Sequence, residues 1–393
     1  MKKNKVLLGI GLVCLFILFA ASFAPAEDGV TDTSIKVGYI GALTGPLAAH
    51  GEPILSGMKI FAKYVNEQGG VNGRKIEIVA ENDSYSPPQT VAAAKKMITR
   101  DKVFCFVGNL GTAPTISIRP LLAKQKVPLL FPGTAATTAF MPVNRYVFSS
   151  LTTYTMEGRL HADFIANCVD NPKIFIFFMD GDIGKEYSAG LKAQLKHYGL
   201  GVIDETSHKY TTVDYSSHAL KAKNSGANVV TLYSIGSPVA RFVLECKKIG
   251  YKPQFILGAA PSISELLKLA GDAIEGAIGT QVGNLQTSYD PVVRKYREVQ
   301  AKYHPGKPTR NVELLGFGYL RTASEAFKRC GRDLTRENLI KALESFKDYD
   351  TGVNGPITFS PSRRIGAESA IIHTNRGGQY KYYVPGWHSY KRF

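Results

Sequence analysis

Apolar and polar residues alternate along the chain in blocks that predict strands and helices in turn. Short apolar runs such as 35–43 and 102–108 predict buried strands, and longer amphipathic stretches such as 52–70 predict helices. Strands separated by helices of about ten to fifteen residues are typical of β-α-β units in a parallel sheet. The predicted strands are 35–43, 74–83, 102–108, 127–133, 173–182, 227–236 and 252–260, and the predicted helices are 52–70, 87–101, 112–126, 156–169, 185–199, 214–226, 237–250, 290–304, 311–330 and 335–347.

This alternation occurs in two series, which predicts two lobes. The first series ends near 146–148, and the second begins at 156–169. A chain of 393 residues with 44% hydrophobic residues is long enough for two cores. The predicted fold class is therefore α/β, with two doubly wound parallel-sheet lobes and an aromatic, antiparallel tail at 377–387.

The first 26 residues have the pattern of a secretory signal peptide. Early lysines are followed by an apolar stretch and by the small-residue sequence Ala24-Pro25-Ala26, where cleavage is expected. An uncleaved membrane anchor is the alternative, but the apolar stretch is shorter than the roughly 20 residues of a membrane span. The mature protein is therefore expected in the periplasm.

The remaining charge is positive and scattered. The formal net charge is +16, and +13 remains once Lys2, Lys3 and Lys5 of the signal peptide are removed. No basic run and no interleaved aromatic residues occur, so the charge favours anionic small ligands and not a nucleic acid.

The cysteines do not form a disulfide framework, because four in such a long mature chain are too few. Each lies in an apolar segment without metal-ligand spacing, which predicts buried free thiols, with one bridge left open. They are Cys105, Cys168, Cys246 and Cys330.

No catalytic, metal or nucleotide motif is present. The sequence lacks a nucleophile elbow, a zinc-protease helix, a phosphate-binding loop and a dinucleotide fingerprint. Asp180-Gly181-Asp182 lacks the further ligands of a calcium loop, so it predicts a polar turn after a strand. A secreted hydrolase is the alternative from another class, but no serine or cysteine lies on such an elbow. We therefore expect a binding protein without cofactor or metal.

Two small-residue turns mark the expected site. Residues 109–112 and 132–135 each follow an apolar strand, at the edge where open α/β sheets place their ligands. Free N–H groups at a helix start favour an anionic oxygen, and small side chains let a ligand approach the backbone. Ordinary capped turns are the alternative for either turn taken alone.

These segments resemble the periplasmic solute-binding proteins of branched-chain amino acid type ABC transporters, the leucine/isoleucine/valine-binding family. The resemblance covers essentially the whole mature chain. Its most specific stretches are Thr44-Gly45-Pro46, the sequence NEQGGVNG at 66–73, NDSYSPPQTVAAAKKMI at 82–98 and KVPLLFPGTAA at 126–136.

The resemblance implies two lobes that close on a small ligand and deliver it to ABC permease membrane subunits. The protein would act as a monomer, and a sensing role with a separate receptor or regulator is the alternative. The implied first lobe is 33–148 plus 284–354, the second is 149–283 plus 355–393, and the three strand crossings lie near 148–151, 279–283 and 356–359.

It also implies a first-lobe half of the site. Leu110, Gly111 and Thr112 match residues that hold a ligand carboxylate, and Gly133 and Ala135 match the next pair. Ala135 lacks the family's hydroxyl, which neighbouring Thr134 would supply. His50 and Tyr154 complete the expected lining on this side.

The second-lobe half departs from the family. Ala260 stands where an acid should meet a ligand ammonium group, and Gly236 and Ile183 stand where aromatic residues are expected. Tyr233 and Asp182 are the remaining candidates there. Losing the acid argues against a free amino acid, since an unpaired buried ammonium is costly. An organic or aromatic acid is favoured, and an amino acid, an amide or another polar solute stays open.

Overall fold

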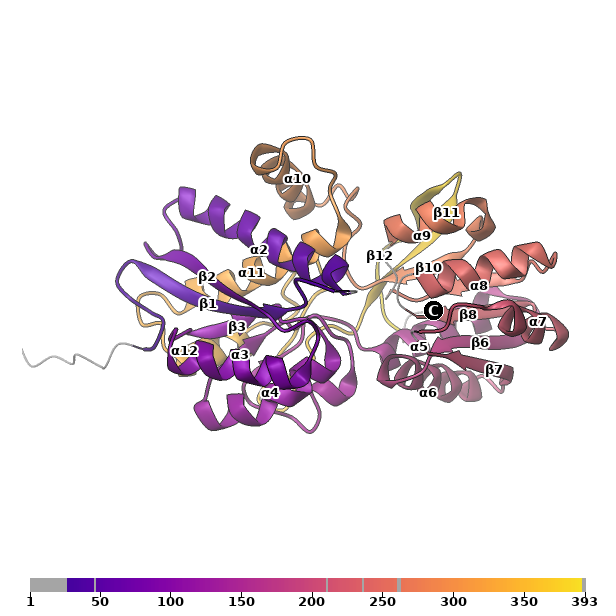
Figure 1. Ribbon diagram of the computed structural model, residues 1–393, viewed down its shortest axis with the longest axis horizontal. Helices are drawn as coiled ribbons and strands as arrows, with labels where there is room; N and C mark the ends of the chain where they lie inside the picture. The colour runs from indigo at the N-terminus through magenta and orange to yellow at the C-terminus, as the bar shows by residue number, and fades with distance from the viewer. Residues whose placement is uncertain (1–26, 46, 210, 235–236, 260–262, 391–393) are drawn as a thin grey trace, which may run out of the picture.

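The computed structural model describes residues 27–390 except 46, 210, 235–236 and 260–262. These residues form two α/β lobes that lie side by side (Figure 1). The predicted signal peptide, residues 1–26, lies outside the described residues. Among the helices of the described ranges, none has the length and apolarity needed to cross a membrane.

The first lobe is built on a five-stranded parallel sheet in the order β2-β1-β3-β4-β5. Its strands are β1 (Ser34–Gly41), β2 (Lys75–Asn82), β3 (Cys105–Val107), β4 (Leu129–Leu130) and β5 (Val147–Phe148). Its helices are α2 (Ala48–Glu67), α3 (Pro87–Thr99), α4 (Thr112–Gln125), the 3-10 helix η1 (Thr137–Ala139), α10 (Pro291–Tyr303), α11 (Asn311–Arg329) and α12 (Arg336–Glu344).

Both faces of this sheet are buried, as a doubly wound fold requires. Tyr39 of β1 packs in the cluster that α2 and α11 cover, whereas the next residue, Ile40, packs in the cluster that α3 and α4 cover. Successive side chains of a strand point to opposite faces, so a strand buried on both faces is apolar throughout. This explains the continuous apolar runs in the sequence.

The second lobe has a seven-stranded mixed sheet in the order β12-β11-β10-β9-β8-β6-β7. Its strands are β6 (Ile174–Met179), β7 (Val202–His208), β8 (Val229–Tyr233), β9 (Gln254–Leu257), β10 (Ile278–Gln281), β11 (Ala370–Arg376) and β12 (Gln379–His388). Its helices are α5 (Tyr154–Cys168), α6 (Asp182–His197), α7 (Ser216–Asn224), α8 (Ser237–Lys248), α9 (Ile263–Ala270) and the 3-10 helix η2 (Gly271–Ile274).

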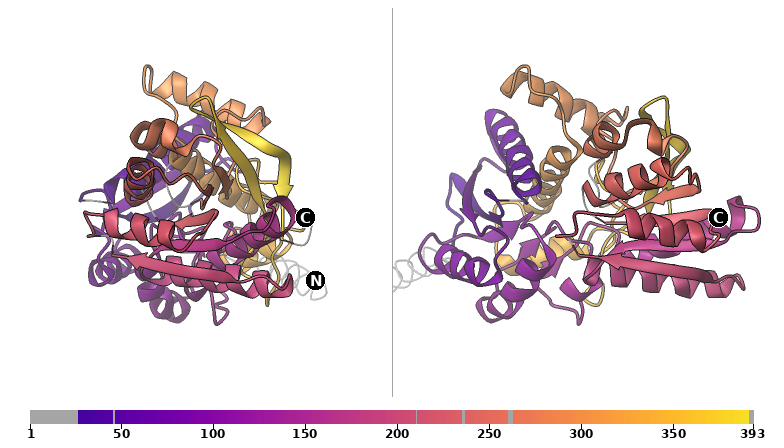
Figure 2. Two further views of the ribbon diagram at one scale, coloured as in Figure 1. Left: turned by 90° about the vertical axis from the view of Figure 1, so that its right-hand side faces the viewer. Right: turned by 45° about the vertical axis from the view of Figure 1, so that its right-hand side comes forward.

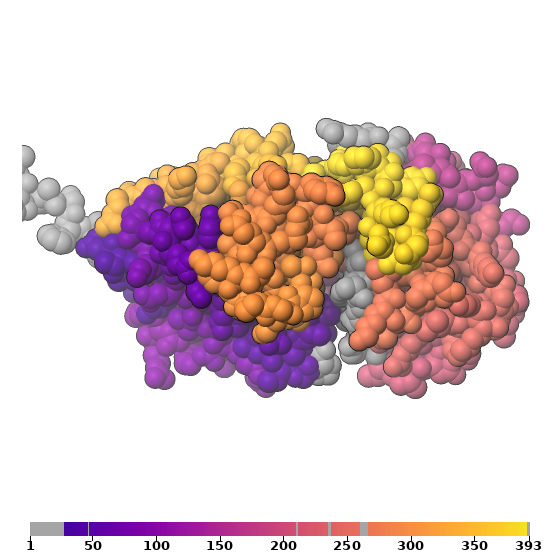
Figure 3. Space-filling view, turned by 90° about the horizontal axis from the view of Figure 1, so that it is seen from above, coloured from indigo at the N-terminus to yellow at the C-terminus, as the bar shows by residue number. Residues whose placement is uncertain are grey.

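The predicted fold class is confirmed, with the antiparallel tail as an extension of the second sheet. Strands β6 to β10 pair in parallel, in the spatial order β10-β9-β8-β6-β7, and β11 and β12 add to β10 as an antiparallel hairpin. This hairpin, in yellow, lies at the edge of the second lobe (Figure 2). Seen from above, it faces α10, in orange, across the boundary between the lobes (Figure 3).

Three chain segments pass between the lobes and are hydrogen-bonded to one another. The Ser149 N–H donates to Arg364 O at 2.8 Å, which joins the first segment to the third. The Asn354 side chain donates to Val282 O at 3.0 Å, which joins the second segment to the turn before the third. Side-chain and backbone bonds therefore tie the crossings into one hinge region.

The exact division of the chain into lobes stays a proposal. Ile357 and Phe359 pack in the first-lobe core, although the proposed division at 354 assigns them to the second lobe. The chain enters the second sheet at β11.

The four cysteines of the described residues are free thiols. The prediction of burial is confirmed for Cys105 and Cys246 and is wrong for Cys168, which is exposed. Cys168 is the last residue of α5, where the helix leaves the core. Cys330 is partly buried.

Candidate functional site

A cavity of about 340 Å³ lies between the two lobes. Its walls come from the starts of α4, α5 and α6, from α2 and α11, and from the crossing that follows β10. The lining residues are Leu47, His50, Ile54, Tyr85, Leu110, Gly111, Thr112, Ala113, Gly133, Thr134, Ala135, Leu151, Tyr154, Glu157, Met179, Gly181, Asp182, Ile183, Tyr233, Ala259, Gln281, Val282, Gly283, Asn284, Asn311, Val312, Leu315 and Tyr319.

On the first-lobe side, two threonine hydroxyls meet at the start of α4. Thr112 Oγ1 and Thr134 Oγ1 are 2.7 Å apart. Leu110 and Gly133 form a parallel bridge that holds the two turns next to each other. The first N–H groups of α4 have no carbonyl partner within the helix, so this corner presents donors and the positive end of a helix dipole. Such a corner suits a carboxylate.

Gly111 is required where these turns meet. Its φ is +105°, and a Cβ there would lie 2.3 Å from Cε2 of Tyr85. Tyr85 therefore packs directly against the turn and lines the cavity beside it. The sequence reasoning missed Tyr85.

Tyr154 joins the first lobe to the start of α5. Its N–H donates to Ala135 O at 3.0 Å across the boundary between the lobes. Burial raises the pKa of its phenol to about 12, against smaller opposing effects of hydrogen bonds to Ala135 and Thr134. The hydroxyl is therefore a neutral group at physiological pH.

On the second-lobe side, the main polar group is a carboxylate that the sequence reasoning missed. Glu157, in the first turn of α5, is 1% exposed and lines the cavity. The Ala259 N–H donates to Glu157 Oε1 at 2.6 Å. The hydroxyls of Thr280 and Tyr233 donate to Oε1 and Oε2, respectively. Burial raises the pKa of this carboxyl, and the three donors lower it in part.

A chain of hydrogen bonds supports Glu157 from behind. Since Thr280 donates to Glu157, the 3.0 Å bond between His161 Nε2 and Thr280 Oγ1 requires the Nε2–H tautomer. His161 Nδ1 then accepts from Tyr187 OH at 2.7 Å. Burial lowers the pKa of His161 to about 3, so the imidazole is neutral. The Tyr187 ring also stacks on Tyr233 at 3.8 Å.

The start of α6 forms the third wall. Gly181 is its N-cap with φ +119°, and Asp182 and Ile183 follow in the first turn. Asp182 and Ile183, both candidates from the sequence, line the cavity. Asp180 forms an ion pair with Lys185 at 3.1 Å and is already neutralised there.

The structure brings the predicted site residues together. All of them line this cavity except Gly236 and Ala260, which lie outside the described residues. The described lining contains no lysine or arginine, so a bound anion would meet hydroxyls and N–H groups. Within the described ranges, no group of three or more His, Cys, Asp or Glu side chains could hold a metal ion.

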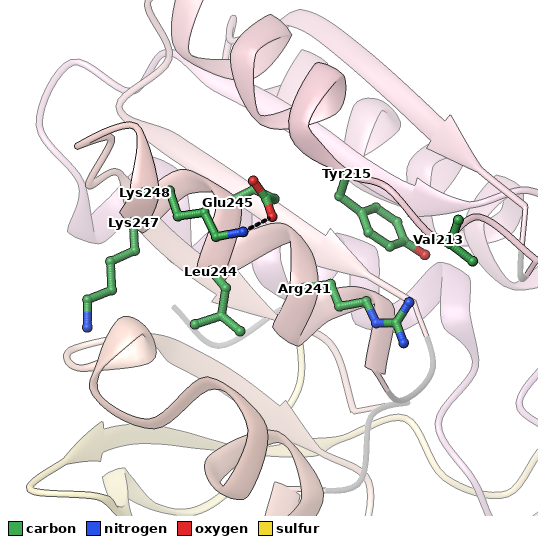
Figure 4. A pocket seen from close by; sticks show the side chains of 7 residues that line it. All are labelled: Val213, Tyr215, Arg241, Leu244, Glu245, Lys247 and Lys248. Carbon is green, nitrogen blue, oxygen red and sulfur yellow. Dashed lines mark hydrogen bonds and ion pairs between the residues drawn. The ribbon is translucent and has the colours of Figure 1, made fainter.

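A second hollow, of about 540 Å³, lies on the surface of the second lobe beside α8. Arg241, Lys247 and Lys248 border it, and Lys248 pairs with Glu245 at 2.6 Å (Figure 4). The first lobe contributes none of its lining residues, so lobe closure would not enclose it.

The sequence matches the family model described as periplasmic binding protein over residues 34–379. It is 25% identical over 328 residues to Leu/Ile/Val-binding protein homolog 7 of Brucella abortus (strain 2308), covering 79% of this chain and 82% of that protein.

Solved structures share the fold. A branched-chain amino acid ABC transporter protein from Thermus thermophilus, solved with bound valine, superposes with a TM-score of 0.83 at 21% identity, covering 92% of this chain and 97% of that chain. A fatty acid ABC transporter substrate-binding protein from Thermomonospora curvata superposes with a TM-score of 0.80 at 23% identity, covering 94% and 96%.

Proposed function

The chain belongs to the periplasmic binding protein family, and from this membership we propose that it is the substrate-binding component of an ABC importer for a small carboxylate-bearing solute. Members of this family bind substrates for transport, so the chain is a binding protein and not an enzyme. Its relatives include Leu/Ile/Val-binding proteins. The fold alone does not identify the solute, because one structural neighbour was solved with valine and another is named for fatty acid transport. The solute must therefore be inferred from the residues that line the cavity.

The observation that carries the proposal is the group of hydrogen-bond donors at the start of α4, formed by the Thr112 and Thr134 hydroxyls and the first N–H groups of the helix. Two hydroxyls 2.7 Å apart and a helix N-terminus face a cavity lined by both lobes. Hydrogen bonds to a charged acceptor stabilise by about 1.5–3 kcal/mol each. The corner thus suits a carboxylate without a basic side chain.

The size of the cavity favours a small solute. Its volume of about 340 Å³ lies at the lower end of ligand sites, which span about 300–1,000 Å³. Apolar side chains such as Ile54, Leu151 and Leu315 form part of its wall. We therefore expect an apolar or aromatic body attached to the carboxylate.

Delivery to a membrane permease would follow closure of the lobes. A ligand that touches both walls binds the closed form more tightly than the open form and so shifts the equilibrium towards closure. The closed monomer would then present both lobes to the permease subunits. Purified protein added to vesicles that hold the permease should support uptake of the solute. Binding of the protein to a receptor, with no uptake into these vesicles, would indicate a sensing role instead.

The location follows from residues 1–26, which we propose to be a cleaved signal peptide. N-terminal sequencing of protein from the periplasmic fraction should begin at Glu27. Recovery of the intact chain in the membrane fraction would instead identify an anchor.

A ligand screen tests the function. Purified protein is heated with amino acids, aromatic and aliphatic acids, and amides, and hits are confirmed by calorimetry. We expect at least one carboxylate to raise the melting temperature, because binding to the folded state alone stabilises it. Binding of amides with no carboxylate hit would contradict the proposal, as would turnover of any bound compound.

A further inference from the structure

Glu157 is a buried carboxylate without a cationic partner among the described residues. None of the described ion pairs includes it, and the described cavity lining has no lysine or arginine. The imidazole of His161, which shares the Thr280 hydroxyl with Glu157, is kept neutral by burial, which lowers its pKa to about 3. The negative charge is therefore held by neutral donors.

Those donors leave part of the carboxylate unsatisfied. A carboxylate has about four acceptor positions. Oε1 accepts from Thr280 and Ala259, whereas Oε2 accepts from Tyr233. Among the described residues, Oε2 therefore has one donor and keeps an acceptor position, in a residue that lines the cavity.

Burying an ionised carboxylate costs several kcal/mol unless an opposite charge compensates it. A ligand that brings a cationic nitrogen would supply both the charge and the missing donor. A plain carboxylic acid would bring a second negative charge towards Glu157.

We propose that Glu157 determines which ligand is bound, by accepting a hydrogen bond from a cationic nitrogen of a solute whose carboxylate lies at the start of α4. The proposal rests on the proposed function, because it takes the α4 corner as the carboxylate site. It adds the requirement for an ammonium group. The acid thus comes from the first turn of α5, whereas the sequence Gly258-Ala259-Ala260-Pro261 contains none.

A structural role for Glu157 is the competing explanation, and the chain offers a matched control. Glu313 on α11 is also buried and also held by neutral hydroxyls, from Tyr296 at 2.7 Å and Ser56 at 2.6 Å. Glu313 does not belong to the described cavity lining. Glu313→Gln therefore removes a comparable buried charge without changing the site.

The test compares each amino acid with its deaminated acid. Dissociation constants for L-valine against 3-methylbutanoate and for L-phenylalanine against 3-phenylpropanoate are measured by calorimetry at pH 7.5. We expect the wild-type protein to prefer the amino member of at least one pair tenfold or more. Glu157→Gln should reduce that preference at least tenfold through loss of affinity for the amino member alone, and Glu313→Gln should keep it.

Three results would overturn the inference. One is a wild-type protein that binds the deaminated member as tightly or more tightly in every pair that binds. Another is an equal loss of preference in Glu157→Gln and Glu313→Gln. The third is loss of preference in Asp182→Asn and not in Glu157→Gln, which would assign the ammonium group to the α6 carboxylate. In the first case a carboxylate still binds, so the proposed function survives.

A wild-type measurement covers the case in which Glu157→Gln does not fold. Burial raises the pKa of Glu157 in the free protein, and a bound cation would lower it. Affinity for the amino member should therefore fall at least threefold between pH 7.5 and pH 5.0, with proton release on binding, and the deaminated member should show no such fall.

The other titratable groups of the described lining are His50, Asp182, Tyr85, Tyr154, Tyr233 and Tyr319. A pH dependence that is equal for the two members of a pair would overturn the inference.

Discussion

Thr112 contributes one of the two hydroxyls at the carboxylate corner, so its removal isolates that contact. Thr112→Ala leaves Thr134 Oγ1 without the partner that lies 2.7 Å away. We expect a carboxylate ligand to bind more weakly by about 1–3 kcal/mol, the cost of an unmade buried hydrogen bond. Calorimetry with the best ligand of the screen measures this, and an unchanged dissociation constant would exclude Thr112 from the site.

Gly111 and Gly181 allow backbone strain and steric contact to be separated. Both are N-caps with large positive φ, at +105° and +119°. A Cβ at Gly111 meets the Tyr85 ring at 2.3 Å, whereas a Cβ at Gly181 meets nothing within 4 Å. Strain alone costs about 1–3 kcal/mol at such positions. Gly111→Ala should therefore lower the free energy of unfolding, measured by urea titration, more than Gly181→Ala does. Equal losses would show that the Tyr85 ring moves aside without a measurable cost.

At the residue scale, the sequence predicts what is local and misses what depends on distant partners. Gly111 and Thr112 follow an apolar strand directly, so their place at a sheet edge is visible in the sequence. Glu157 is held by Tyr233, Ala259 and Thr280, which lie on other elements far along the chain. Its only local signal is an acid on the face of α5 that also carries buried Leu160 and Phe164.

Element boundaries agree best where both faces of a strand are buried. Strand β6 is apolar almost throughout and was predicted, whereas β7 has the sequence VIDETSH and was not. Strand β7 is at the edge of the sheet, and its half-exposed residues lack the apolar run of a central strand. Helix α9 was also missed, because its eight residues are too few for a clear period.

Helix α6 contacts the first lobe through one carboxylate. The N–H groups of Thr137 and Thr138, in η1, donate to Glu186 Oε2 at 2.7 Å and Oε1 at 3.1 Å. This contact bridges the lobes next to the cavity. We expect it to break when the lobes move apart.

Glu186→Gln should therefore speed ligand release. An amide has one acceptor oxygen where the carboxylate has two, so at least one of the bonds is lost, which corresponds to about 1–1.5 kcal/mol or roughly a five- to tenfold faster dissociation. Stopped-flow displacement measures the rate. Glu205→Gln is the control, since Glu205 pairs with Lys192 inside the second lobe at 2.7 Å. Equal rates in the two variants would show that the η1 contact does not hold the lobes closed.

For the whole molecule, two buried histidines make stability depend on pH. Burial lowers the pKa of both His161 and His373 to about 3. Between that value and the ordinary value near 6.5, only the unfolded chain binds the protons, so stability falls as pH falls through this window. The limiting slope is about 1.4 kcal/mol per pH unit for each histidine. Glu157 acts in the opposite sense, because its raised pKa lets the folded state take up a proton first.

His373→Gln separates these contributions. Urea unfolding at pH 7.5 and pH 5.0 should show a smaller loss of stability on acidification in the variant than in the wild type. If both lose the same amount, His373 does not titrate in the unfolded chain as expected, or the imidazole is already protonated in the fold.

Because the described cavity lining has no lysine or arginine, the association rate and the dissociation rate of the ligand should respond differently to salt. The chain without its predicted signal peptide has a net charge of +13, and its described lysines and arginines lie outside that lining, so they act on an approaching anion over the range of the Debye length, about 8 Å at physiological ionic strength. Once the lobes enclose the ligand, neutral donors hold it and dissolved ions are kept out. For a solute with a net negative charge, such as 3-phenylpropanoate, added salt should therefore slow association and leave the dissociation rate nearly unchanged. At high salt the protein would then bind such a solute more slowly, and the bound solute would have the same residence time.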